Sequence, residues 1–319
     1  MLEILLDNKD GTIWDISELV SSVSWQTTRI GKPSKLSLTL IKDTDKKLKV
    51  ETGAVIRVKA DDKGIFYGYV FTKEQSQKDE ITLTAYDQIR YLQANDTYVF
   101  TGATATDVIK RIASDFELKT GTLEDTRYKI PSMVEDNQKL LDIIYKALDL
   151  TLINTGQIYV FYDDFGSLTL KNAKSMALDT IVGDESLLYE YSYKRSIDDD
   201  VYNRVKLVKN NKDTGKRDVY IAQDSANIAK WGRLQLYQTV DEGLNEAQIK
   251  EQLDRLIQLK NREQIKFDLT ALGDISVRAG CYIPIFLSEL SIGKYFLVEE
   301  CTHKWEGKLY TMSLEVKVV

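Results

Sequence analysis

Histidine and cysteine, the side chains that most often ligate metals or act as nucleophile and base, are scarce in this sequence. Its 319 residues include one histidine, His303, and two cysteines, Cys281 and Cys301. This scarcity excludes a disulfide framework and a zinc site with the usual Cys/His spacing. Cys301, His303 and Trp305 occupy every second position, so on a strand they share one face. Two ligands do not make a metal site, and we expect a packed histidine and small buried cysteines.

Two short motifs imitate catalytic or cation-binding loops. Asp164-Phe165-Gly166 has the spelling of the metal-binding triplet of protein kinases, but the other kinase motifs are absent from the sequence. We therefore expect a hairpin turn there. Asp198-Asp199-Asp200 lacks the further spaced oxygen ligands and the turn glycine of a calcium loop, which favours a solvated turn. No Gly-Lys pair is followed by the Ser or Thr of a phosphate-binding loop.

The abundant acidic and tyrosine side chains single out no site. With 49 Asp and Glu residues, some carboxylate pair suited to glycoside cleavage is expected by chance. The 18 tyrosines lie mostly in strand-like segments, where sheet packing accounts for them. We therefore predict no catalytic residue, no cofactor and no metal ion, and a protein that is not an enzyme.

The composition is that of an acidic globular protein. It is 43% hydrophobic and 29% charged, and 43 Lys and Arg against 49 Asp and Glu give a net charge of -6. These values exclude disordered and fibrous classes, and the negative charge argues against sequence-specific nucleic-acid binding. The first residues, Met1 to Trp14, carry no basic leader, and no run reaches the roughly 18 apolar residues of a membrane span. We expect no export signal and no membrane segment.

Strand patterns dominate both ends of the chain. Up to about Tyr91, runs such as Lys35–Leu40 and Ile81–Tyr86 alternate polar and apolar side chains, with turn residues between them. From about Thr180 onwards, strands rich in tyrosine and β-branched residues return, interrupted by one amphipathic helix expected at 245–261. The first of these regions predicts a small antiparallel barrel or sandwich.

The middle of the chain has a different pattern. Thr104 to Asp107 opens an amphipathic run typical of a capped helix, and a second helix is expected from Asn137 to Leu150. A hairpin of Gln157–Tyr162 and Ser167–Leu170 would follow. These elements predict a compact insertion of two helices and a hairpin.

Segments near the end of the chain repeat segments near its start in the same order. Gly53–Val58 matches Gly280–Ile285, Tyr67–Lys73 matches Phe296–Thr302, the alternating run from Ile81 matches that from Tyr310, Val23–Trp25 matches Tyr191–Tyr193, and Leu36–Leu40 matches Val205–Leu207. The first of these pairs lies 227 residues apart and the next two 229. Shared order at a nearly constant spacing indicates that one barrel fold occurs twice.

The predicted fold class is therefore mainly β with an α+β insertion. Two similar antiparallel β-barrel (tube-type) domains, at 1–95 and 179–319, would flank a helix-helix-hairpin domain at 96–178. The second barrel would include the helix at 245–261.

Two sequence blocks and this domain order carry a family resemblance. Ile81–Leu92 closes the first region; Arg278-Ala279-Gly280, Val298–Trp305 and Tyr310–Leu314 end the chain. Over essentially the full length, the chain resembles the XkdQ-type baseplate hub proteins. These belong with the late-control protein D group of contractile phage tails and phage-tail-like particles.

The resemblance implies a structural baseplate hub. Such a hub is a homotrimer that joins the hexameric tail tube to the central spike and contacts other baseplate proteins. It would lie in the tail or baseplate of a phage or phage-tail-like particle assembled in the bacterial cytoplasm. Three chains with two similar barrels each would present six modules, which lets a three-fold object dock on a six-fold tube.

Two other classes of protein stay open. A two-barrel binding or adhesion module would be a monomer with an exposed aromatic cluster. A cell-wall hydrolase would cleave peptidoglycan and would lose that activity when one carboxylate is substituted.

Overall fold

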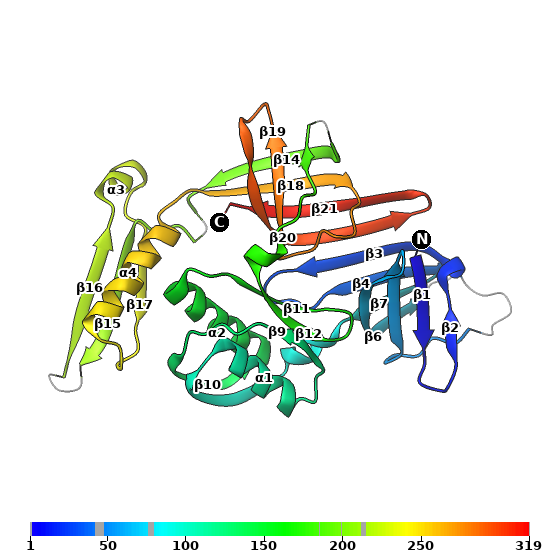
Figure 1. Cartoon of the computed structure of the whole chain (residues 1–319), viewed down its shortest axis with the longest axis horizontal. Helices are drawn as coiled ribbons and strands as arrows, with labels where there is room; N and C mark the ends of the chain where they lie inside the picture. Colours follow the sequence, from blue (N-terminus) through cyan, green and yellow to red (C-terminus); the bar gives the residue numbers. More distant parts are fainter. Residues whose placement is uncertain are drawn as a thin grey trace.

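The computed structural model describes residues 2–41, 48–75, 80–184, 186–198, 200–211 and 215–318. Strands dominate both ends of the chain, and two of the longer helices lie in its middle (Figure 1). One sheet of thirteen strands contains strands from both ends. No helix within the described ranges is long and apolar enough to cross a bilayer.

The first half-sheet comprises the strands of residues 2–86. Their alternating pattern buries side chains such as Leu36, Leu38 and Leu40 on one face and leaves polar side chains on the other. Its elements are β1 (Leu2–Asp7), β2 (Ile13–Asp15), η1 (Ser17–Leu19), β3 (Val20–Thr28), β4 (Lys35–Ile41), β5 (Val55–Ala60), β6 (Lys63–Gln75) and β7 (Glu80–Tyr86).

The second half-sheet comprises strands of residues 182–317. Phe267, Phe296 and Met312 lie in its core and are fully buried. Its elements are β13 (Val182–Gly183), β14 (Leu188–Ser196), β18 (Gln264–Leu272), β19 (Tyr282–Leu287), β20 (Ile292–Glu306) and β21 (Leu309–Lys317).

The two half-sheets are one continuous sheet, not the two closed barrels that the sequence predicts. Strand β3 pairs with β4 along one edge and with β20 along the other. The second edge of β3 is therefore unavailable for closing a barrel with β1 or β2. No closed barrel occurs among the described strands, although the antiparallel, mainly β character of both ends is as predicted.

The internal repeat is real, and the structure corrects its register. The order β3-β4-β7-β6-β5 in the first half-sheet recurs as β14-β18-β21-β20-β19 in the second. Bulges recur too, at Val20/Ser22 and Leu188/Glu190, and again at Val70/Thr72 and Val298/Glu300. Val23–Trp25 corresponds to Tyr191–Tyr193 and Gly53–Val58 to Gly280–Ile285, as predicted, whereas the other matches need revision.

Two predicted matches shift and a third is wrong. Val70 corresponds to Val298, one residue away from the predicted alignment. The Gly53 amide donates to the Val70 carbonyl at 2.7 Å, and the Gly280 amide donates to the Val298 carbonyl at 2.8 Å. The pairings of β7 and β21 equate Ile81 with Met312 instead of Tyr310. The match of Leu36–Leu40 with Val205–Leu207 is wrong, because β18, the strand that pairs with β14, takes that place.

Residues 204–260 form a side unit that the sequence assigned to the second barrel. A three-stranded sheet, β16-β15-β17, stands apart from the large sheet and packs against α4 (Figure 1, left). The predicted helix is confirmed, with Asn245 as N-cap in a capping box with Gln248. The elements are β15 (Arg204–Asn211), β16 (Lys216–Gln223), α3 (Ser225–Trp231), β17 (Gln235–Thr239) and α4 (Glu246–Lys260).

The middle region contains the two predicted helices and the predicted hairpin. Thr104 caps the first helix in a capping box with Asp107, and Gly156, with φ of 69°, ends the second. The second helix begins at Leu140 because β10 occupies the residues before it. The elements are η2 (Gln88–Gln93), β8 (Asn95–Ala103), α1 (Ala105–Asp115), β9 (Thr120–Leu123), β10 (Ile130–Lys139), α2 (Leu140–Thr155), β11 (Tyr159–Asp163), β12 (Leu168–Asn172) and η3 (Ala173–Met176). The domain limits at 95 and 178 stay a prediction.

Candidate functional site: the seam of the large sheet

The seam is the antiparallel pairing of β3 with β20, the only place in the described chain where the two half-sheets share a strand ladder. It runs from Thr28 opposite Glu300 to Ser22 opposite Glu306. Both strands alternate in character, so one side of the seam is apolar and buried and the other is polar.

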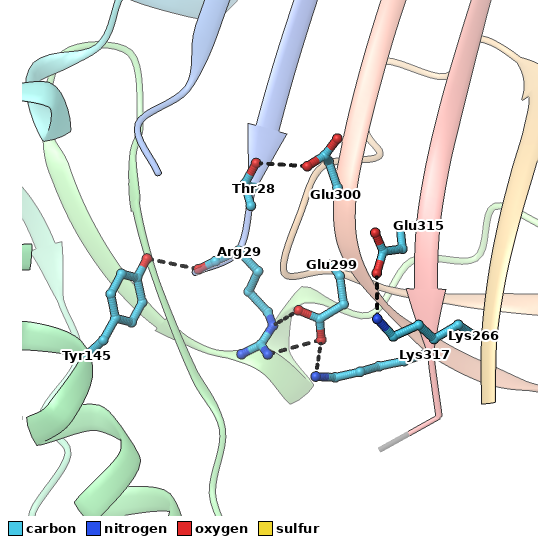
Figure 2. A network of polar contacts seen from close by, with 8 residues as sticks. All are labelled: Thr28, Arg29, Tyr145, Lys266, Glu299, Glu300, Glu315 and Lys317. Atoms are coloured by element: carbon cyan, nitrogen blue, oxygen red, sulfur yellow. Dashed lines mark hydrogen bonds and ion pairs between the residues drawn. The ribbon is translucent and has the colours of Figure 1, made fainter. Parts of the chain in front are cut away.

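An ion-pair network closes one end of the seam (Figure 2). The Arg29 guanidinium donates to both carboxylate oxygens of Glu299, at 2.9 and 3.0 Å, and Lys317 Nζ lies 2.7 Å from Glu299 Oε1. Burial acts to raise the pKa of Glu299, but Arg29 and Lys317 hold it below its usual value. The Tyr145 hydroxyl donates to the Arg29 carbonyl at 2.9 Å. Helix α2 of the middle region is thereby tied to the seam.

His303 lies at the buried, apolar side of the seam. Its ring stacks on Trp25 of β3, with centroids 5.0 Å apart. Nε2 lies 2.8 Å from the Val277 carbonyl, which only accepts, so Nε2 carries the hydrogen and Nδ1 accepts from the Tyr310 hydroxyl. Burial lowers the pKa of His303 to about 4, so the ring is neutral. The predicted packed histidine is confirmed.

The cysteines are free and buried, as predicted. Cys301 Sγ lies 3.2 Å from His303 Nε2, and burial raises the pKa of Cys281 to about 11. A protonated thiol is a poor nucleophile and a poor ligand. Within the described ranges, no group of three or more His, Cys, Asp or Glu side chains is placed to hold a metal ion.

A buried carboxylate pair, missed in the sequence, joins the first half-sheet to the middle region. Asp87 follows β7 and accepts from the Ser34 and Ile89 amides, both at 3.0 Å. Asp163 ends β11 and accepts from Gln88 Nε2 at 2.6 Å and from the Gly166 amide at 2.7 Å. Burial raises the pKa of Asp87 to about 7, with a further contribution from Asp163, whose own pKa is raised by burial. Since all four oxygens already accept hydrogen bonds, the arrangement suits fastening more than acid-base catalysis.

Of the two motifs that imitate catalytic or cation-binding loops, the first forms a turn and the second is only partly described. Asp164-Phe165-Gly166 is the predicted hairpin turn, with Phe165 and Gly166 at φ of 49° and 84°. The Phe165 ring packs edge-on against Tyr67 of β6, 6.0 Å between centroids, so the turn is a contact between regions. In the aspartate run, Asp199 lies outside the described residues, and Asp200 pairs with Lys260.

Hydroxyl and charged side chains cover the second half-sheet and the seam on the face opposite the cores. One row crosses the seam through laterally paired residues: Glu190, Thr270, Ser313, Thr302, Gln26 and Lys35. An open depression on the second half-sheet, lined among others by Asp268, Glu300 and Glu315, gives this face an acidic patch. Polar side chains therefore form one continuous surface from the second half-sheet across the seam to β4, where Tyr86, the partner of Lys35, ends the row.

Comparisons with known proteins agree with this architecture. The sequence profile of the YQBQ-like family matches residues 23–317. The chain belongs to the YQBQ-like family. The protein XkdQ of the phage-like element PBSX from Bacillus subtilis (strain 168) is 33% identical over 311 residues, 94% of this chain and 93% of XkdQ. YqbQ from the same strain is 32% identical over 305 residues, 94% of this chain and 92% of YqbQ. The predicted resemblance to XkdQ-type tail proteins is confirmed.

Solved structures share the fold of this YQBQ-like chain. The 43 kDa tail protein of prophage MuSo2 from Shewanella oneidensis has a TM-score of 0.72 at 14% identity, covering 98% of both chains. The E. coli c3393 protein, a type VI secretion component described as similar to the phage T4 tail proteins gp27 and gp5, has a TM-score of 0.57 at 9% identity. That match covers 99% of this chain and 76% of c3393. The YQBQ-like chain thus has a phage-tail protein fold.

Proposed function

We propose that the protein is the trimeric hub of a contractile tail, an adaptor that joins the hexameric tail tube to the central spike. The observation that carries this proposal is the duplication: two half-sheets with the same strand order and the same bulges, joined edge to edge. Three such chains supply six similar modules, the number a six-fold tube presents. The likeness to c3393, itself described as similar to gp27, supports the same role.

The seam suits a rigid adaptor that performs no chemistry. Its ladder, its ion-pair network and the His303 stack fix one half-sheet against the other. The buried Asp87 and Asp163 fix the middle region against the first half-sheet. The polar face of the large sheet would line the lumen of the ring, where a surface of hydroxyls and carboxylates would not retain DNA.

The rival binding-module hypothesis expects an exposed aromatic cluster. An aromatic cluster does occur on the outer face of β6, where Tyr67, Tyr69 and Phe71 meet Tyr91 and Phe165. Its rings are mostly half-buried, because they pack between the first half-sheet and the middle region. We therefore assign it to packing and keep the hub as the proposed function.

Light scattering after size exclusion, together with co-sedimentation with tail particles, tests the proposal. A hub gives three times the chain mass of 36.5 kDa, or joins the particles when it trimerises only on the tube. A chain that stays monomeric and never sediments with tails contradicts the proposal.

A further inference from the structure

The internal repeat predicts a second joint equivalent to the seam. Each of its two strands has one edge that no other described strand covers. Within the seam, β20 of the second half-sheet pairs with β3 of the first. The repeat equates β20 with β6 and β3 with β14. Among the described strands, β14 pairs only with β18, and the segment Thr72–Gln75 of β6 pairs only with β7. A single chain therefore leaves open one edge of β14 and one edge of β6, although the equivalent edges of β3 and β20 are joined in the seam.

The register of such a second joint follows from the seam. The recurring bulges equate Val298 with Val70 and Leu188 with Val20. The seam pair Glu300–Thr28 then becomes Thr72–Ser196, and the pair Thr302–Gln26 becomes Glu74–Lys194. Both new pairs place one residue on each open edge.

We propose that β14 of one copy pairs antiparallel with β6 of a second copy, with Ser196 opposite Thr72 and Lys194 opposite Glu74. This inference rests on the proposed trimeric hub and names its interface. The contact joins two different edges, so it is head-to-tail and forms a ring when three copies close it. Each ring then alternates internal seams with joints between copies.

Charge and shape at the two edges fit this pairing. Lys194 and Glu74 are exposed and carry opposite charges, and opposite charges facing each other across strands are favourable. Where the seam has the Arg29–Glu299 ion pair, the new joint would bring together Ile197 and Phe71, both half-exposed. An apolar contact would thus replace a salt bridge.

One facing pair makes the joint weaker than the seam. Arg195 would lie opposite Lys73, two like charges. Each is already engaged in its own chain: Arg195 pairs with Glu263, and Lys73 Nζ donates to the Val50 carbonyl at 3.1 Å. The joint therefore suits a contact made during assembly. It would also cover two exposed strand edges that otherwise invite aggregation.

Cysteine cross-linking tests the register. The Arg29 amide donates to the Glu299 carbonyl at 2.9 Å, so the adjacent pair, Glu300 and Thr28, is a non-hydrogen-bonded pair. Its equivalents, Thr72 and Ser196, would inherit the short Cα separation that a disulfide accepts. The variant Thr72→Cys/Ser196→Cys is expressed as the full chain and oxidised, both purified and in assembled tail particles. Native Cys281 and Cys301 are buried and do not interfere.

We expect covalent dimers and trimers on non-reducing gels, and none from either single variant. Thr72→Cys/Lys194→Cys, with the partner moved by two residues, is the register control and should cross-link at least tenfold less. Glu74→Lys should weaken the trimer, and adding Lys194→Glu should restore it. If the trimer or the particle forms but the designed pair does not cross-link, the interface is wrong and the hub proposal stands. If the chain neither trimerises nor enters particles, the hub proposal fails and the interface fails with it.

Discussion

The two half-sheets share a strand order but differ in what covers their leading strand. In the first half-sheet, β3 is covered by β20, and only the short segment 29–34 separates it from β4. In the second, the equivalent strand β14 has an open edge, and the side unit at 204–260 is inserted before β18. The paired strands have kept the common framework, whereas the first connection and the free edge have diverged. One copy is specialised for contacts within the chain, and its twin is free for contacts outside it.

Substituting equivalent aromatic residues on β3 and β14 should give the largest difference in the free energy of unfolding. Trp25 is buried against His303, whereas its counterpart Tyr193 is half-buried at the open edge. Trp25→Ala should lower the free energy of unfolding by about 4 kcal/mol, because it opens a large cavity at the seam. Tyr193→Ala should cost about 1 kcal/mol in the isolated chain. Urea unfolding measures both, and equal losses would contradict the difference between the two edges.

The contributions of two buried groups, His303 on β20 and Asp87 after β7, to the stability of the chain should depend on pH in opposite directions. The folded-state pKa of His303, about 4, lies below its ordinary value of 6.5, so the unfolded chain binds more protons between these values. Stability from His303 therefore falls as pH drops from 6.5 to 4, by about 3 kcal/mol in total. The pKa of Asp87, raised by burial to about 7 from 3.8, acts the other way, and stability from it falls as pH rises through that interval.

Single variants separate the two contributions. His303→Gln should leave a stability that decreases as pH rises from 4 to 7, whereas Asp87→Asn should rise more steeply than the native chain between pH 4 and 6.5. Thermal unfolding at half-unit pH steps gives the slopes. Identical slopes in both variants would refute the assignment of the charges.

The glycines that lead β5 and β19 offer a matched pair. Gly53 and Gly280 have φ of 86° and 94°, which an L side chain rarely adopts, but their surroundings differ. A Cβ on Gly53 would meet open space, and one on Gly280 would lie 2.3 Å from Val160 Cγ1. Gly53→Ala should cost about 1 kcal/mol from the backbone alone, and Gly280→Ala about 3 kcal/mol because overpacking adds to it. Equal costs in urea unfolding would show that Val160 moves aside freely.

Two ion pairs at the same end of the large sheet should show the smallest difference in their contribution to the free energy of unfolding. Glu299 is largely buried between Arg29 and Lys317, while Glu315 faces Lys266 with both side chains about two-fifths exposed, at 41% and 42%. Glu299→Gln should cost about 2 kcal/mol, since it leaves the largely buried Arg29 without its charged partner. Glu315→Gln should cost no more than about 0.5 kcal/mol. A larger loss from Glu315→Gln would place the fastening of the seam elsewhere.

Alternation along the chain was enough to predict most strands, the capped helix after Thr104 and the helix at 246–260, because these depend on neighbouring residues. It could not tell which strand pairs with β14, since Val205–Val208 and Gln264–Leu272 both look like buried strands. Pairing partners are decided by packing between distant segments. The Asp87–Asp163 pair was missed for the same reason, because nothing in the spacing of two distant aspartates signals that burial brings them together. The packed histidine was predictable, because too few other ligands exist in the sequence.

The seam also orders events in time. Strand β3 is synthesised well before β20, because Gln26 and Glu300, which bond across the seam, are 274 residues apart. The first half-sheet must therefore wait, with one edge uncovered, until β20 has been synthesised. Its nascent edge is most exposed to wrong partners on a polysome, where neighbouring chains carry the same unfinished strand.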